Sequence, residues 1–179
     1  FFFFFFLFSP SFFFISPPPP PKKKKKKKKK DAARRAMQAL WSRRAHQSDL
    51  VGTTINISSG NWLRLDSGVG AGIDSYYEYL LKSYIMLGDE TYLNVFNTHY
   101  AAIMRYLKRG PFLVNSQINN PTSTRKMMDA LQMFWPGLQV LKGDLYPAIE
   151  THRMYYDIVQ RYRFAPEGFG IDMSVGFGP

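Results

Sequence analysis

Three glycines precede an acid and a helix-forming run in the stretch SGVGAGIDSYYEYLL, residues 67–81. Glycines before a helix can cradle a phosphate, but the spacing of Gly68, Gly70 and Gly72 is not G-x-G-x-x-G, and no lysine follows it. Asp74 would also repel a phosphate at this helix N-terminus. The sequence therefore favours tight turns and close backbone packing for the glycines, and the carboxylate of Asp74 needs another explanation.

The residues after Asp74 resemble a capping box. Ser75 and Glu78 have the S-x-x-E spacing in which the serine caps the helix and the glutamate reaches back to the cap. Asp74 would then project from the mouth of the helix. Taken by itself, Asp74 is explained either as an extra anion favoured by the helix dipole or as a catalytic carboxylate.

Other residues that could do chemistry give weaker signals. His46, His99 and His152 do not have metal-ligand spacing, so surface or hydrogen-bonded positions are expected for them. Asp129 lies in the apolar run MMDALQMFW, and a buried acid must be paired, which indicates a structural or supporting role. The chain has no cysteine, which excludes disulfides and thiolate metal sites within it.

Asn56-Ile57-Ser58 forms an N-glycosylation sequon in a loop-like stretch. Asn56 is therefore a candidate glycosylation site. Such triplets also arise by chance, so this sequon is only a weak indication of the secretory pathway.

Residues 1–30 have low complexity, with a phenylalanine-rich start, a proline run and nine consecutive lysines. Without those lysines the formal charge of the chain falls from +11 to +2, so the basic balance is local. No aromatic or arginine residues alternate with the lysines, as single-stranded nucleic acid binding would require, and we expect no nucleic-acid partner. We interpret 1–30 as a disordered tail or an artefact of the gene model.

From residue 31 onward the apolar pattern predicts an all-α fold of helical hairpins whose connections contain short strands. A hairpin-like connection is expected within 50–65, and a β-like segment at 112–118. The predicted helices are 32–45, 75–88, one capped by Asp89 that ends before Gly110, 124–135, and one beginning at Pro147.

Several long motifs resemble a known family. DSGVGAGIDSYYEYLLKSYIMLGD, FNTHYAAIMRY, MDALQMFWPGLQVLKGD, PAIETH and FAPE are similar to the alpha-mannosidase-like proteins that promote endoplasmic reticulum degradation, in glycoside hydrolase family 47. The likeness is strongest to the third, catalytically competent vertebrate-type branch and covers about 36–169. It implies a fragment of an (α/α)7 barrel, with a tail at 1–30, a partial catalytic domain at 31–169 and a divergent tail at 170–179.

The resemblance also implies a function. Family members trim alpha-1,2-linked mannose from N-glycans by inversion, with a calcium ion in the barrel, and the trimmed glycan marks misfolded glycoproteins for disposal. It assigns catalytic roles to Asp74 and Glu167, because an inverting glycosidase needs one carboxylic acid and one carboxylate. Which residue is the acid and which the base stays open.

The implied partners are high-mannose N-glycans on misfolded glycoproteins and a protein disulfide isomerase-type oxidoreductase, and the implied location is the endoplasmic reticulum lumen. The family's further catalytic glutamates and its calcium-binding threonine have no counterpart here, so we expect no metal ligand within this chain. Two alternatives stay open: a lectin-like protein that binds trimmed glycans without cutting them, and a non-functional truncated product. Because an incomplete barrel leaves apolar faces open, we expect the chain alone to be aggregation-prone and inactive.

Overall fold

The computed structural model describes residues 23–122 and 124–175. The chain divides into two units, 1–35 and 36–179, and helix α1, Lys23–Ser42, crosses the boundary between them. This helix begins before the predicted residue 32, because lysine has a good helix propensity and nothing in the sequence interrupts the run. It ends at Ser42, before the predicted residue 45. The phenylalanine-rich start lies outside the described residues.

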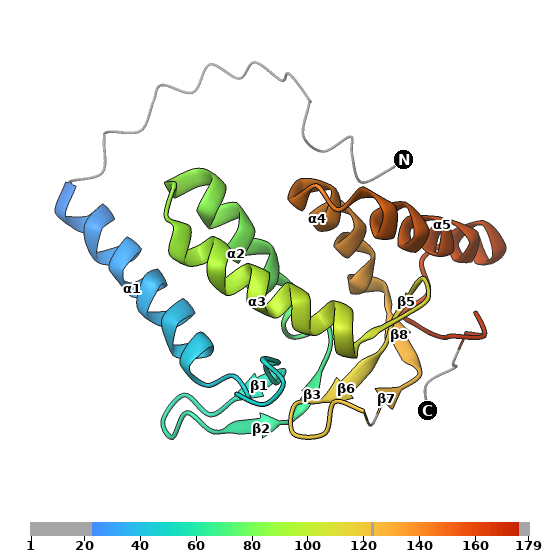
Figure 1. Cartoon of the computed structure of the whole chain (residues 1–179), viewed down its shortest axis with the longest axis horizontal. Helices are drawn as coiled ribbons and strands as arrows, with labels where there is room; N and C mark the ends of the chain where they lie inside the picture. The colour runs from blue at the N-terminus through green and yellow to red at the C-terminus, as the bar shows by residue number, and fades with distance from the viewer. Residues whose placement is uncertain (1–22, 123, 176–179) are drawn as a thin grey trace, which may run out of the picture. The chain divides into compact units, whose positions relative to one another are not determined.

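Two helical hairpins dominate the second unit, which agrees with the predicted fold class; the first of them, α2 with α3, is the pair that the sequence predicts. Helices α2, Asp74–Leu87, and α3, Glu90–Tyr106, pack against each other, and so do α4, Trp135–Lys142, and α5, Leu145–Tyr162 (Figure 1). Gly88 ends α2 in the left-handed conformation, at φ 64°, and its amide donates to the carbonyl of Tyr84 over 2.8 Å. None of the described helices has the length and apolar character that a membrane crossing requires.

Short antiparallel strands form the connections between the helices (Figure 1). The predicted hairpin within 50–65 is β1, Thr54–Ile55, paired with β2, Trp62–Arg64. The β-like segment 112–118 becomes β5, Phe112–Leu113, which pairs with β4, Lys108–Arg109, and β6, Asn115–Gln117, which pairs with both β3, Asp66–Ser67, and β7, Thr124–Arg125. Strand β8, Met127–Asp129, pairs with β9, Gly168–Gly170.

The predicted helix at 124–135 is wrong. This segment contains β7, β8 and the 3-10 helix η2, Ala130–Phe134, and α4 begins at Trp135, where the predicted helix ends. Pro136 is tolerated because it lies in the first turn of α4, where backbone amides have no partner within the helix. Pairing of β8 with residues about forty positions later overrides the local helical pattern.

The main core lies around the α2–α3 hairpin. Tyr77, Phe96, Ile103 and Trp135 are fully buried in it, and the ring of Trp135 stacks on Tyr100 at 5.7 Å between centroids. A second cluster forms beside α5 from Met128, Met154, Tyr155, Ile158 and Phe169. Strand β8 therefore contributes a side chain, Met128, to this second cluster.

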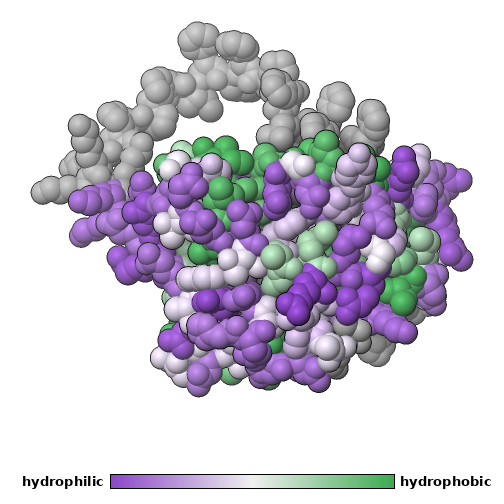
Figure 2. Space-filling view, in the orientation of Figure 1, coloured by the Kyte–Doolittle hydropathy of each residue, from purple (hydrophilic) through white to green (hydrophobic). Residues whose placement is uncertain are grey.

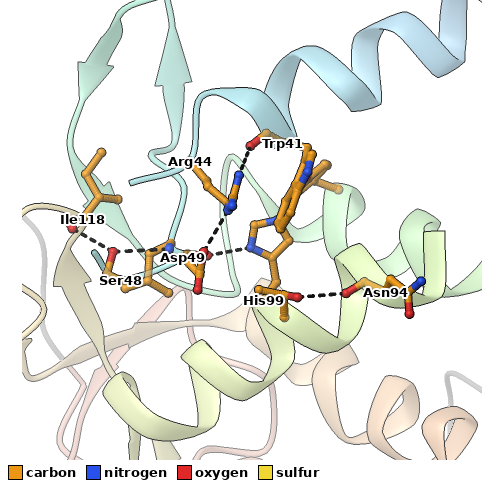
Figure 3. Close-up of polar contacts among 10 residues, drawn as sticks. Trp41, Arg44, Ser48, Asp49, Asn94, His99 and Ile118 are labelled. Carbon is orange, nitrogen blue, oxygen red and sulfur yellow. Dashed lines mark hydrogen bonds and ion pairs between the residues drawn. The ribbon is translucent and has the colours of Figure 1, made fainter. Parts of the chain in front are cut away.

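His99 of α3 is buried and hydrogen-bonded, as expected for a histidine without metal-ligand spacing. Its Nδ1 donates to the carbonyl of Asp49 over 2.7 Å, so Nε2 is free to accept from the hydroxyl of Tyr76 at 3.1 Å. Arg44 pairs with the carboxylate of Asp49 at 2.8 Å (Figure 3). Burial lowers the pKa of His99 to about 4, so the ring is neutral at physiological pH.

An exposed apolar surface covers the end of α2 and the α4–α5 hairpin, where Figure 2 shows hydrophobic side chains gathered along the upper edge of the view. Tyr146 is 90% exposed and Met86 79%. The surface also includes Ile85, Leu87, Val140, Leu141, Leu145 and Ile149. Contiguous exposed apolar side chains of this kind mark a surface that is normally covered.

Candidate active site

Asp74 is the first residue of α2 rather than a residue outside the helix. The N-cap position is Ile73, which makes no side-chain cap, and the Oδ1 atom of Asp74 accepts a hydrogen bond from the amide of Ser75 at 2.6 Å. The predicted capping box is therefore wrong, because Glu78 pairs with Lys82 at 2.5 Å one turn further along. Asp74 is partly exposed at the mouth of the helix, as predicted.

The glycine segment, residues 68–72, passes very close to two polar side chains from distant parts of the chain. A Cβ atom on Gly68 would lie 2.1 Å from Oδ1 of Asn115, and one on Gly70 would lie 2.3 Å from Oδ2 of Asp129. Only glycine permits such an approach. The prediction of close backbone packing for these glycines is confirmed.

Asp129 contacts the glycine segment directly. Both of its carboxylate oxygens lie 3.3 Å from the amide nitrogen of Ala71, which donates to them. Burial raises the pKa of Asp129, and the charge of Asp74 raises it further, while the nearby backbone amides of Ala71, Leu131 and Gln132 offset part of the rise. Asp129 lies on β8 and not on the helix that the sequence predicts, and it supports the segment that leads into α2.

Glu167 reaches the same region through β9. The register of β8 and β9 places Gly168 opposite Asp129, and the carbonyl of Glu167 accepts a hydrogen bond from the amide of Ala130 at 3.2 Å. The side chain of Glu167 is exposed. The structure thus connects both predicted catalytic residues to Asp129, Asp74 through the glycine segment and Glu167 through the strand pair.

A shallow pocket lies beside Asp74. Its lining includes Thr53 and Ile55 of the β1 region, Trp62 of β2, and Tyr76 of α2. Aromatic side chains next to a carboxylate are suited to contact with a sugar, whose faces are apolar and whose rim carries hydroxyls. These residues share no local motif, so their proximity to Asp74 follows only from the tertiary structure.

The sequon lies at the turn between β1 and β2. Oδ1 of Asn56 accepts hydrogen bonds from the amides of Ser58 at 2.9 Å and Ser59 at 3.1 Å, and the side chain of Ile57 is 95% exposed. Asn56 therefore has a structural role in the turn as well as the spacing of a glycosylation site. Across the described parts of the chain, no group of three or more His, Cys, Asp and Glu side chains could hold a metal ion.

Comparison with known proteins identifies the family. The sequence profile described as "Glycosyl hydrolase family 47" matches residues 24–175. The chain is 58% identical over 144 residues to "ER degradation-enhancing alpha-mannosidase-like protein 3" of Xenopus laevis, which covers 80% of this chain and 16% of that protein. It is 46% identical over 147 residues to "Alpha-mannosidase I MNS4" of Arabidopsis thaliana, covering 82% of this chain and 23% of that protein.

The fold agrees with these sequence matches. The structure of an alpha-1,2-mannosidase from Trichoderma reesei superposes with a TM-score of 0.69 at 20% identity, over 87% of this chain and 36% of that one. The helical hairpins seen here are thus part of the (α/α)7 barrel, as the resemblance implied. The chain belongs to glycosyl hydrolase family 47.

Proposed function

We propose that this chain is a segment of a longer, inverting alpha-1,2-mannosidase that trims mannose from N-linked high-mannose glycans. The observation that carries the proposal is the connection of Asp74 and Glu167 to one structural unit, built from the glycine segment, β8 and β9. The family membership and the activities for which the relatives are named support it.

The two carboxyl groups have the chemistry that inversion requires. One carboxylic acid protonates the glycosidic oxygen as the bond to the sugar breaks, and one carboxylate removes a proton from a water that attacks the opposite face of the ring. Both side chains are accessible, since Asp74 is partly exposed and Glu167 is exposed. Either residue can take either role in this proposal.

We propose that an active protein requires further parts of the barrel beyond this chain. The chain spans about one sixth of the length of the Xenopus relative, and the exposed apolar surface on α2, α4 and α5 is suited to contact with further hairpins of the barrel. We therefore propose that the chain alone is aggregation-prone and inactive. The described residues do not fit a calcium site by themselves, so calcium ligands in the whole protein are proposed to come from other parts of the barrel.

The proposed setting is the endoplasmic reticulum lumen, where the enzyme would act on misfolded glycoproteins and so promote their degradation. The names of the relatives and the candidate sequon at Asn56 support this setting. A protein disulfide isomerase-type oxidoreductase is the proposed protein partner. Because this chain has no cysteine, any disulfide with that partner would involve residues outside it.

The test is a product assay on the complete protein with a high-mannose N-glycan. We expect release of mannose that appears first as the β-anomer in proton NMR, which inversion of an α-linkage requires. Asp74→Asn and Glu167→Gln should each lower kcat by roughly 100-fold or more, since each removes a proton-transfer group. Glu90→Gln is the matched control, because Glu90 is likewise an acid in the first turn of a helix, α3, and should leave activity unchanged.

Other outcomes favour the alternatives. Glycan binding that persists without any product would indicate a lectin-like protein. First appearance of the α-anomer would contradict inversion. Equal activity of Asp74→Asn and Glu90→Gln would mean that Asp74 serves only the helix dipole.

A further inference from the structure

We propose that Asp129 is a positioning residue that holds the glycine segment against β8 and thereby orients the carboxylate of Asp74. This inference rests on the proposed function, because it concerns the reaction in which Asp74 takes part. Asp129 is not assigned a contact with the substrate. Its action passes through the backbone of Gly70 and Ala71.

The carboxylate of Asp129 is in close contact with the backbone of the glycine segment. The amide of Ala71 lies 3.3 Å from both oxygens of Asp129, so the N–H points between them and the carboxylate is held symmetrically. The Cα of Gly70 is so close that a Cβ there would lie between 2.3 and 2.6 Å from three atoms of the carboxyl group. The carboxylate thus fixes the glycine segment both by a charge-assisted hydrogen bond and by direct packing.

Gly70, which Asp129 contacts, also belongs to the turn that leads into Asp74. The carbonyl of Gly70 accepts hydrogen bonds from the amide of Ile73 at 3.3 Å and from the amide of Asp74 at 3.1 Å. The peptide that Asp129 holds is therefore the same turn that starts α2. A shift of Gly70 or Ala71 would change the direction in which the first helical residue presents its side chain.

Ionising Asp129 at this position has an energetic cost. A carboxylate that is partly buried near a second carboxylate is unfavourable, and both effects raise the pKa of Asp129. The hydroxyl of Tyr155 on α5 is also within electrostatic reach of Asp129, since the charge of Asp129 contributes to the raised pKa of that tyrosine. A neutral asparagine would avoid the charge repulsion, so an acid here is better explained by what its two oxygens hold.

The strand that carries Asp129 is held by its pairing with β9. Asp129 lies at the end of β8, whose pairing with β9 continues to Gly168, next to Glu167. The neighbouring Met128 is buried in the core beside α5. Because the same strand fixes the backbone of Glu167, a fixed Asp129 keeps the two proposed catalytic residues in a constant relation.

The test compares Asp129→Asn with wild type in the complete protein, in the product assay described above. We expect kcat to fall by roughly 10- to 100-fold with KM changed by less than about threefold, since a small misplacement of a reacting group affects the chemical step. The acid limb of the kcat profile should become less steep, because the variant has lost a group that must be ionised. Loss of thermal stability with wild-type kcat and an unchanged profile would show a purely structural role and overturn the proposal.

A second variant approaches the same contact from the other side. Gly70→Ala adds a Cβ against the carboxylate and should also lower kcat without raising KM, whereas Gly137→Ala, which has no atom within 4 Å of the added Cβ, should not. If Asp129→Asn does not fold, a folded Gly70→Ala decides the question: wild-type kcat overturns the proposal and a lowered kcat supports it. Asp74→Asn separates the two levels of inference. If Asp74→Asn retains full activity, the catalytic assignment fails; if it is inactive while Asp129→Asn is fully active, only the positioning role fails.

Discussion

Lowering the pH should destabilise the folded protein through His99, because the folded state holds this ring neutral. The pKa of His99 falls from 6.5 to about 4 on folding, chiefly by burial. Since the folded pKa lies below the unfolded value, the unfolded chain takes up the proton first as the pH falls. The stability that His99 contributes is complete above pH 6.5 and is lost between about pH 6.5 and pH 4.

The magnitude follows from the size of the shift. At 1.36 kcal/mol per tenfold change in proton affinity, a fall of the pKa from 6.5 to about 4 corresponds to about 3 kcal/mol when both states have titrated, and most of this is already lost at pH 4.5. The hydrogen bonds explain why the folded state resists protonation. Nδ1 already donates to the carbonyl of Asp49 (Figure 3). A proton on Nε2 would therefore remove the acceptor that the hydroxyl of Tyr76 uses.

The assay is urea denaturation of the complete protein at pH 7.5 and pH 4.5, followed by tryptophan fluorescence. The transition compared is the cooperative unfolding of the domain that contains His99. Trp41 is a suitable probe because its ring meets His99 edge-on at 5.2 Å between centroids. His99→Gln is the control, since glutamine keeps a donor and an acceptor but does not titrate. Wild type should lose about 2 to 3 kcal/mol more than the variant between the two pH values. Equal losses in both proteins would refute the reasoning, and contributions of carboxylates such as Asp129 cancel in the comparison.

Three further predictions use single substitutions. Gly88→Ala should cost about 1 kcal/mol of unfolding free energy, because the residue needs φ 64° to end α2, whereas Gly137→Ala in α4 should be neutral or slightly stabilising in the same urea titration. Trp135→Ala should cost about 3 to 5 kcal/mol because the ring is fully buried, while Ile57→Ala, at 95% exposure in the turn between β1 and β2, should change stability by less than about 0.5 kcal/mol. When the protein is expressed through the secretory pathway, an N-glycosidase should shift the gel mobility of wild type by one glycan more than that of Asn56→Gln. Identical shifts would show that the sequon is unused.

The parts of the fold predicted correctly from sequence depend on neighbouring residues. Gly88 and Asp89 end one helix and begin the next, because a left-handed glycine and a side chain that accepts from Thr91 are local devices. The exposed or hydrogen-bonded positions of the histidines also followed from spacing alone. The family resemblance rested on long motifs and supplied the barrel, which local patterns do not contain.

The failures at 75–78 and 124–135 have different physical causes, a competing local pair in the first segment and a distant partner strand in the second. Glu78 fits a capping box in sequence, but Lys82 lies one turn away on the same helix and takes its carboxylate. Met127 to Asp129 fit a helix by periodicity, but they pair with Gly168 to Gly170 instead. Backbone hydrogen bonds to a partner strand outweigh the small free-energy differences of helix propensity.

The sequence by itself indicated which acids are candidates for catalysis and which glycines are expected to pack closely against another part of the chain. It singled out Asp74, Glu167 and Asp129 as separate residues with separate explanations. Only the tertiary structure decided that the carboxylate of Asp129 lies against Gly70 and that β8 and β9 bring Glu167 to the same unit. The physical reason is that strand pairing and side-chain packing act over a few ångströms in space, whereas these residues are separated by about 40 to 90 positions along the chain.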